Sequence, residues 1–68
     1  MTDFTLVDHG SIAVITPLNQ NATDWVDEHI SDDAQWMGDG FVVEHRYVDD
    51  IIGGIQGDGY EVRPVNIN

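Results

Sequence analysis

Residues 4–16, FTLVDHGSIAVIT, hold two short apolar runs separated by a turn, and this stretch decides the fold class. The first run alternates apolar and polar residues, which is typical of a strand with one face on a core. The second run, residues 12–16, is rich in β-branched side chains. Between them, the Asp8 carboxylate suits an Asx turn and Gly10 can take a positive φ. We therefore expect a β-hairpin.

A helix is predicted to follow the hairpin, from about residue 20 to 30, with Asn19 or Asn21 as its N-cap. Its apolar side chains recur at three- and four-residue spacing. They are Ala22, Trp25, Val26, His29 and Ile30. The opposite side carries Asp24, Asp27 and Glu28. Burial of the apolar stripe would expose these three carboxylates.

The segment from residue 31 to 37 predicts at most a short turn of helix that carries Trp36 and Met37 toward the core. Gly38 and Gly40 then break the chain. A third strand is expected over residues 41–45, where most side chains are apolar.

A second helix is predicted to begin near Val48, because four apolar residues share one face at i, i+3, i+4 and i+7. They are Val48, Ile51, Ile52 and Ile55. Gly57 is the expected C-cap. Gly53 and Gly54 weaken a helix, so we expect them to permit close packing on the sheet or on another subunit. A last strand near residues 60–65 would be an edge strand because it contains Pro64.

The predicted order is ββαβαβ, which favours an α+β fold: a two-layer sandwich with one four-stranded sheet and two helices on one face. The 68 residues are expected to form one domain, residues 1–68. The chain has no cysteine, so its core or an oligomer interface must supply its stability. A homodimer through the Gly53–Gly54 face or an edge strand is one expectation.

Charge is the main clue to function: thirteen carboxylates stand against Arg46 and Arg63, and the net charge is −11. Such a surface argues against direct nucleic-acid binding and against anionic membranes, because phosphate contacts need cations. It favours a basic protein surface as partner. The first residues lack the features of a secretion signal and no run reaches membrane-spanning length, which predicts the cytoplasm.

The predicted partner-binding residues lie on the first helix and the loop after it. They are Asp24, Asp27, Glu28, Asp32, Asp33, Trp36 and Asp39. Carboxylates on rigid elements can imitate a phosphate backbone and occupy a basic groove built for nucleic acid. The alternative is a structural or housekeeping homodimer whose acidity serves solubility or life at high salt. Mimicry requires clustered carboxylates, whereas salt adaptation spreads them evenly.

Neither a metal site, a cofactor nor a catalytic residue is predicted. His9, His29 and His45 have no metal-ligand spacing, and His29 is expected to be a hydrogen-bonded core residue. The run DHGS at residues 8–11 cannot adopt triad geometry, because its residues are consecutive. We therefore predict a non-enzymatic protein; a metal-assisted enzyme that uses His9 or His45 is the third hypothesis.

Six aromatic side chains are predicted to form most of the core. They are Phe4, Trp25, Trp36, Phe41, Tyr47 and Tyr60. The alternative for Trp36, in an acidic loop, is an anchor at an interface with another protein. Tyr47 beside Arg46 is a second candidate anchor.

The layout resembles short acidic proteins of unknown role encoded by bacteria and their phages. The resemblance is carried by Asp8-His9-Gly10-Ser11, by Pro17-Leu18 and by Trp25, and spans nearly the whole chain. It implies no catalytic residue. Phage-encoded inhibitors of nucleic-acid-handling proteins are often small, acidic and without enzymatic activity, so the resemblance favours an inhibitor.

Overall fold

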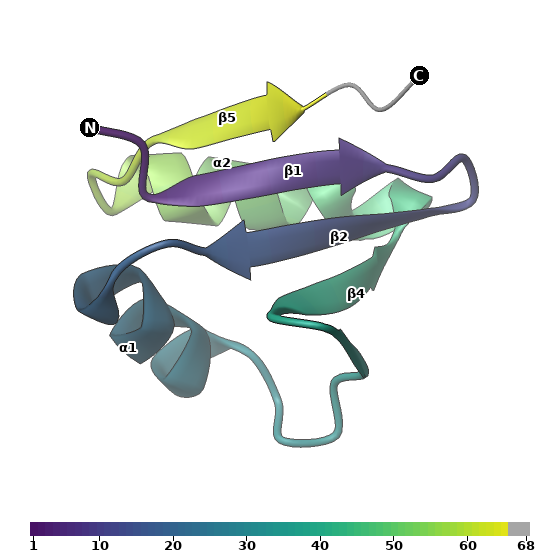
Figure 1. Ribbon diagram of the computed structural model, residues 1–68, viewed down its shortest axis with the longest axis horizontal. Helices are drawn as coiled ribbons and strands as arrows, with labels where there is room; N and C mark the ends of the chain where they lie inside the picture. Colours follow the sequence, from purple (N-terminus) through teal and green to yellow (C-terminus); the bar gives the residue numbers. More distant parts are fainter. Residues whose placement is uncertain (66–68) are drawn as a thin grey trace.

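The structure, a computed structural model, describes residues 1–65. Within this range the chain forms five strands, two α-helices and one 3-10 turn (Figure 1). The strands are β1 (Phe4–Asp8), β2 (Ile12–Pro17), β3 (Trp36–Met37), β4 (Gly40–Glu44) and β5 (Val62–Val65), and the helices are α1 (Gln20–His29), η1 (His45–Tyr47) and α2 (Val48–Gly57). No helix in this part of the chain is long and apolar enough to cross a membrane.

The strands form one mixed sheet in the order β3-β4-β2-β1-β5. β5 lies parallel to β1, and the other neighbours are antiparallel. The α+β class is confirmed, but the prediction of four strands is wrong. Trp36 and Met37 form an edge strand instead of a helical turn, because Gly38 adopts a φ of 63° and folds them back onto Phe41 and Gly40.

The turn chemistry expected at the hairpin is confirmed. The backbone N–H of Gly10 donates to the Asp8 carboxylate over 2.8 Å, and Gly10 has a φ of 93°. α1 begins at Asn19, whose side-chain oxygen accepts from the N–H of Ala22 at 2.8 Å. These short-range hydrogen bonds set both boundaries where the sequence places them.

The end of α2 differs from the prediction. The residue with positive φ is Gly59, at 93°, and not Gly57. The N–H groups of Gly59 and Tyr60 donate to the carbonyls of Gln56 and Ile55, at 3.0 and 3.2 Å. This pair of bonds is a Schellman motif, which needs its left-handed residue two positions after the last helical residue.

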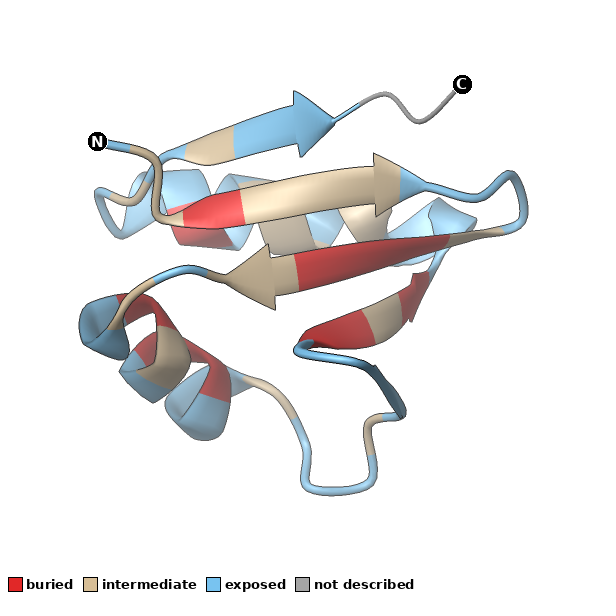
Figure 2. Ribbon diagram, viewed as in Figure 1, coloured by how far each residue is buried: buried red, intermediate tan, exposed pale blue. Residues whose placement is uncertain are grey.

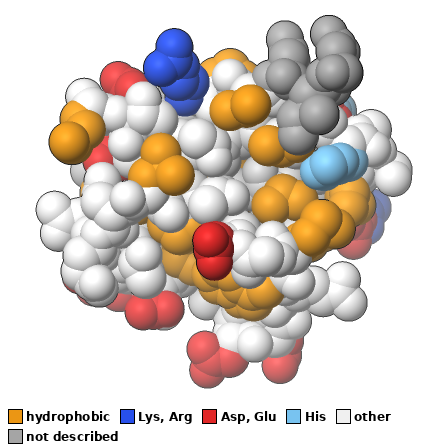
Figure 3. All heavy atoms as spheres, viewed as in Figure 1, with side chains coloured by type: hydrophobic (Ala, Val, Ile, Leu, Met, Phe, Trp, Pro, Cys, Tyr) orange, Lys and Arg blue, Asp and Glu red, His pale blue; other side chains and the backbone are white. Residues whose placement is uncertain are grey.

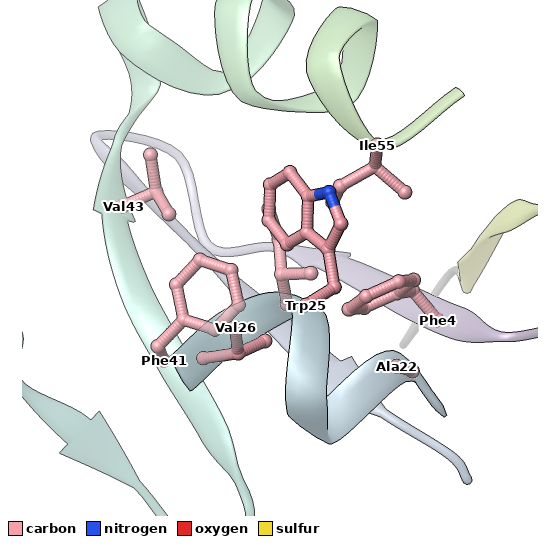
Figure 4. Packing of buried hydrophobic residues seen from close by; sticks show 8 residues of the cluster. Phe4, Ala22, Trp25, Val26, Phe41, Val43 and Ile55 are labelled. Atoms are coloured by element: carbon pink, nitrogen blue, oxygen red, sulfur yellow. The ribbon is translucent and has the colours of Figure 1, made fainter. Parts of the chain in front are cut away.

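Both helices contribute to one core on the same face of the sheet, as predicted (Figures 2 and 4). Its buried members are Phe4, Ile15, Ala22, Trp25, Val26, Phe41, Val43 and Ile55. Trp25 of α1 packs edge-on against Phe4, with ring centroids 6.0 Å apart. A Cβ on Gly54 of α2 would lie 3.7 Å from the Trp25 ring. The glycine pair therefore meets α1 of the same chain at Gly54, whereas no described atom lies within 4 Å of a Cβ on Gly53.

Within residues 1–65 no helix covers the opposite side of the sheet, which we call the open face (Figure 1). Strand register assigns to it Thr5, Val7, Ile12, Val14, Thr16, Met37, Gly40, Val42, Glu44, Arg63 and Val65. Most of these side chains are partly exposed, and Met37 and Val65 are 51% and 39% exposed. A predominantly apolar surface therefore covers one side of the molecule.

Candidate protein-binding surface

The predicted partner-binding residues all lie in one stretch, residues 24–39, which we call the acidic segment. It comprises the outer side of α1, the loop after it and the β3–β4 turn (Figure 1). Its six carboxylates are all exposed. They are Asp24, Asp27, Glu28, Asp32, Asp33 and Asp39.

The exposure of the helical carboxylates follows from how α1 packs. Ala22, Trp25 and Val26 are its buried residues, so side chains on the far side point to solvent. The only polar partner of these carboxylates in residues 1–65 is the Gln20 amide, which donates to Asp24 over 2.9 Å. None of the three ion pairs in this range includes one of the six carboxylates of the acidic segment. Their negative charge is therefore not neutralised within the described chain.

A surface depression of about 490 Å³ lies beside the acidic segment. It is lined by Thr16, Pro17, Leu18, Thr23, Trp36, Gly38 and Asp39. Leu18 and Trp36 are each 50% exposed and provide apolar walls, while Asp39 is the only charged residue of the lining. Such a hollow can receive a side chain that has an apolar stem and a cationic end.

Trp36 does not lie in the core, so that expectation is wrong for this residue. It belongs to an edge strand of two residues, which has a neighbour on one side only. The Trp36 ring packs edge-on against Phe41, with 6.0 Å between the ring centroids. The rest of the Trp36 side chain is exposed to solvent. Tyr47 is also exposed, whereas Phe4, Trp25 and Phe41 are buried as predicted and Tyr60 is partly buried.

The remaining seven carboxylates are distributed over other parts of the fold. They are Asp3, Asp8, Glu44, Asp49, Asp50, Asp58 and Glu61. Two of them lie in the first turn of α2 and the others at or near element ends. Most red side chains visible in Figure 3 lie toward the margin of the open face. Six of the thirteen carboxylates therefore lie in the acidic segment, and seven lie elsewhere in the fold.

The histidines do not assemble a metal site within residues 1–65, where no group of three potential ligands comes together. His29 stacks on Trp25 at 4.4 Å, and its Nδ1 lies 2.9 Å from the Trp25 carbonyl oxygen. It is hydrogen-bonded as expected, but it is exposed and not a core residue. Asp58 accepts from the Trp25 indole N–H at 2.6 Å and lies 3.7 Å from His29 Nε2. This cluster joins α1 to the end of α2.

Comparison with protein families, curated proteins and solved structures finds no significant match. The resemblance to small acidic bacterial and phage proteins therefore stays a prediction.

Sequence reasoning missed the other walls of the depression. Thr16, Pro17, Leu18 and Thr23 come from the end of β2 and the start of α1. They meet Trp36 only because the β3–β4 hairpin folds back beside β2. No local pattern around these residues marks them as a site; the one available signal is Leu18, an apolar residue between a strand and a helix cap.

Proposed function

We propose that this chain is a non-enzymatic binding module that uses the acidic segment and the adjoining depression to engage a positively charged protein surface. The observation that carries the proposal is the half-exposed Trp36, which lines the depression together with Asp39, in a segment whose six exposed carboxylates have no cationic partner in residues 1–65. Exposed apolar surface rimmed by polar residues marks protein–protein interaction sites, and tryptophan is enriched among binding hot spots.

The partner is expected to place an arginine or lysine side chain in the depression. Its aliphatic stem would lie on Leu18 and Trp36, and its charged end would reach Asp39 or the face of the indole. The carboxylates of α1 and the following loop would contact further basic groups. Protein surfaces that bind nucleic acid carry such groups in rows, so an inhibitor of a nucleic-acid-handling protein is the function that this surface supports best.

The first test uses a fluorescent oligoarginine peptide as the probe and anisotropy as the measurement. The triple variant Asp24→Asn, Asp27→Asn, Glu28→Gln should bind it about 3- to 150-fold more weakly, because each lost exposed pair contributes roughly 0.2–1 kcal/mol. Affinity should also fall steeply with added salt, because exposed charges are screened.

The matched control is Asp49→Asn, Asp50→Asn, Glu61→Gln, which removes three exposed carboxylates outside the acidic segment. A general attraction between opposite charges would weaken equally in both variants. Equal loss in the two variants would therefore contradict a defined site, and unchanged affinity in the first variant would overturn the proposal.

The second candidate function is the structural domain whose acidity serves solubility or high salt. The specific observation in its favour is that seven of the thirteen carboxylates lie outside the acidic segment. This candidate predicts that both triple variants bind the probe alike.

A further inference from the structure

The open face has a composition that a solvated sheet face rarely has. Antiparallel sheets with one face in water normally alternate apolar and polar residues along each strand. Here β2 and β4 place Ile12, Val14 and Val42 on the open face, and β1 adds Val7. On these three adjacent strands four of the eight open-face residues are apolar, beside Thr5, Thr16, Gly40 and Glu44, and Val14 is already buried in the single chain. The face is therefore more apolar than the alternating pattern of a solvated sheet face would make it.

We propose that the open face is the interface of a homodimer, in which two copies pack sheet against sheet around a two-fold axis. Each copy keeps its helices, and with them the carboxylates of α1, on the outside of this assembly. Such packing of two sheets, about 10 Å apart, is the arrangement of β-sandwiches.

The distribution of charge makes this face the place where a second copy can bind. Two chains of net charge −11 repel one another wherever their carboxylates face each other. The strand residues of the open face include one carboxylate, Glu44, and one of the two arginines of the chain, Arg63, and Figure 3 shows a further carboxylate near the middle of this side. Glu44 is also paired with Arg46, with 3.0 Å between Oε2 and Nε. Two copies can therefore meet on the open face with less repulsion than on the acidic segment.

The available area suits a dimer. The molecule measures 28 × 27 × 22 Å and exposes 4627 Å². One side of a body with these proportions is roughly a sixth of that surface, about 770 Å², whereas a standard interface buries ~800 Å² on each partner. The open face is therefore large enough for a specific contact.

The routes to a dimer expected from the sequence are less suitable. The edge strand β3 has two residues, and the edge strand β5 contains Pro64, which has no N–H to donate. Short edges and proline prevent pairing between sheets. Gly54 faces Trp25 of its own chain. Neither the edges nor the glycine pair offers the continuous apolar area of the open face.

Sedimentation velocity across a range of protein concentrations tests this proposal. The wild-type chain should sediment at twice the 7.6 kDa mass of one chain, and the dimer fraction should rise with added salt as repulsion between the two copies is screened. The double variant Met37→Glu, Val65→Glu should weaken the dimer at least about 100-fold, because it opposes like charges across an apolar contact.

Met37 and Val65 are both exposed in the single chain, so the double variant should keep its fold. Circular dichroism checks this. The matched control is Tyr47→Glu, Gln56→Glu, which adds the same charge at two exposed residues outside both the open face and the depression. It should remain dimeric. A wild-type monomer at every salt concentration, or an unaffected dimer in the open-face variant, would overturn the proposal. Neither result bears on binding of oligoarginine by the acidic segment.

Discussion

At the scale of single residues, Asp3 connects three parts of the fold. One carboxylate oxygen accepts from the Asn19 side chain at 2.8 Å, and the other accepts from the backbone N–H of Glu61 at 2.9 Å. Its backbone carbonyl accepts from the N–H of Leu18 at 2.8 Å. Hydrogen bonds to one residue, Asp3, thus hold together the start of β1, the N-cap of α1 and the entry to β5.

These contacts give stability a pH dependence. The N–H of Glu61, and then the Asn19 amide, lower the pKa of Asp3 below its ordinary 3.8 in the folded chain. The folded state therefore favours the carboxylate, and this contribution is present above pH 3.8 and lost as pH falls through the lowered pKa. Asp3→Asn should lower the melting temperature at pH 7, and the difference from wild type should shrink in thermal melts below pH 3.8. A constant difference would contradict the assignment.

The two tryptophans should respond differently to truncation. Trp25 is 6% exposed, so Trp25→Ala should lower the free energy of unfolding by about 3–5 kcal/mol in urea titrations. Trp36 is 50% exposed, so Trp36→Ala should cost much less stability. It should instead weaken oligoarginine binding about 30-fold, as expected for a hot spot of ~2 kcal/mol.

Tyr47→Ala is the control for that measurement. Tyr47 is 48% exposed and lies under the Arg46 guanidinium, which is 4.9 Å from the centroid of its ring, and it does not line the depression that contains Trp36. Its truncation should leave oligoarginine binding unchanged. If Tyr47→Ala weakens oligoarginine binding and Trp36→Ala does not, then Tyr47 and not Trp36 is the aromatic residue that contacts the peptide.

At the scale of elements, two glycines have opposite roles. A Cβ on Gly40 of β4 would lie 2.5 Å from side-chain atoms of both Val14 and Thr16. Glycine is needed there because β2 and β4 approach closely at that point. Gly53, inside α2, has no atom within 4 Å of its would-be Cβ and a helical backbone, so nothing in the described chain requires glycine.

Alanine substitutions distinguish these roles. Gly40→Ala should lower the free energy of unfolding by about 1–3 kcal/mol, because Val14 and Thr16 must shift. Gly53→Ala should raise it by about 0.5–1 kcal/mol, because alanine favours helix and reduces the entropy of the unfolded chain. Urea titrations at one protein concentration measure both changes in the free energy of unfolding. A loss of stability in Gly53→Ala would mean that other atoms fill the space beside Gly53.

At the scale of the whole molecule, net charge opposes folding. Thirteen carboxylates and two arginines are held within a radius of gyration of 10.9 Å, and like charges repel most strongly in the compact state. The same charge would draw a basic partner to the surface and restrict self-association to the open face.

Thermal melts at rising salt should show this repulsion. The melting temperature of the wild-type chain should increase from about 10 mM to 0.5 M sodium chloride as screening shortens the range of repulsion. The triple variant Asp24→Asn, Asp27→Asn, Glu28→Gln should be more stable than wild type at low salt and should gain less from added salt. A melting temperature that is independent of salt in both proteins would exclude a significant role for repulsion.

Local patterns determined much of this protein. The hairpin at Asp8 and Gly10, the cap at Asn19 and the apolar face of α1 were predictable, because short-range hydrogen bonds and helical periodicity depend on neighbouring residues. The exposure of Asp24, Asp27 and Glu28 follows from the same periodicity.

Only the tertiary structure decided the rest. The strand β3 exists because Gly38 turns Trp36 and Met37 back onto β4, and the depression exists because that hairpin lies beside the end of β2. The open face appears only when strand order is known, since the apolar residues of β1, β2 and β4 adjoin one another in the sheet and not in the chain. Pairing between distant segments depends on the packing of the whole core, so a short apolar run does not determine which strands lie beside it in the sheet.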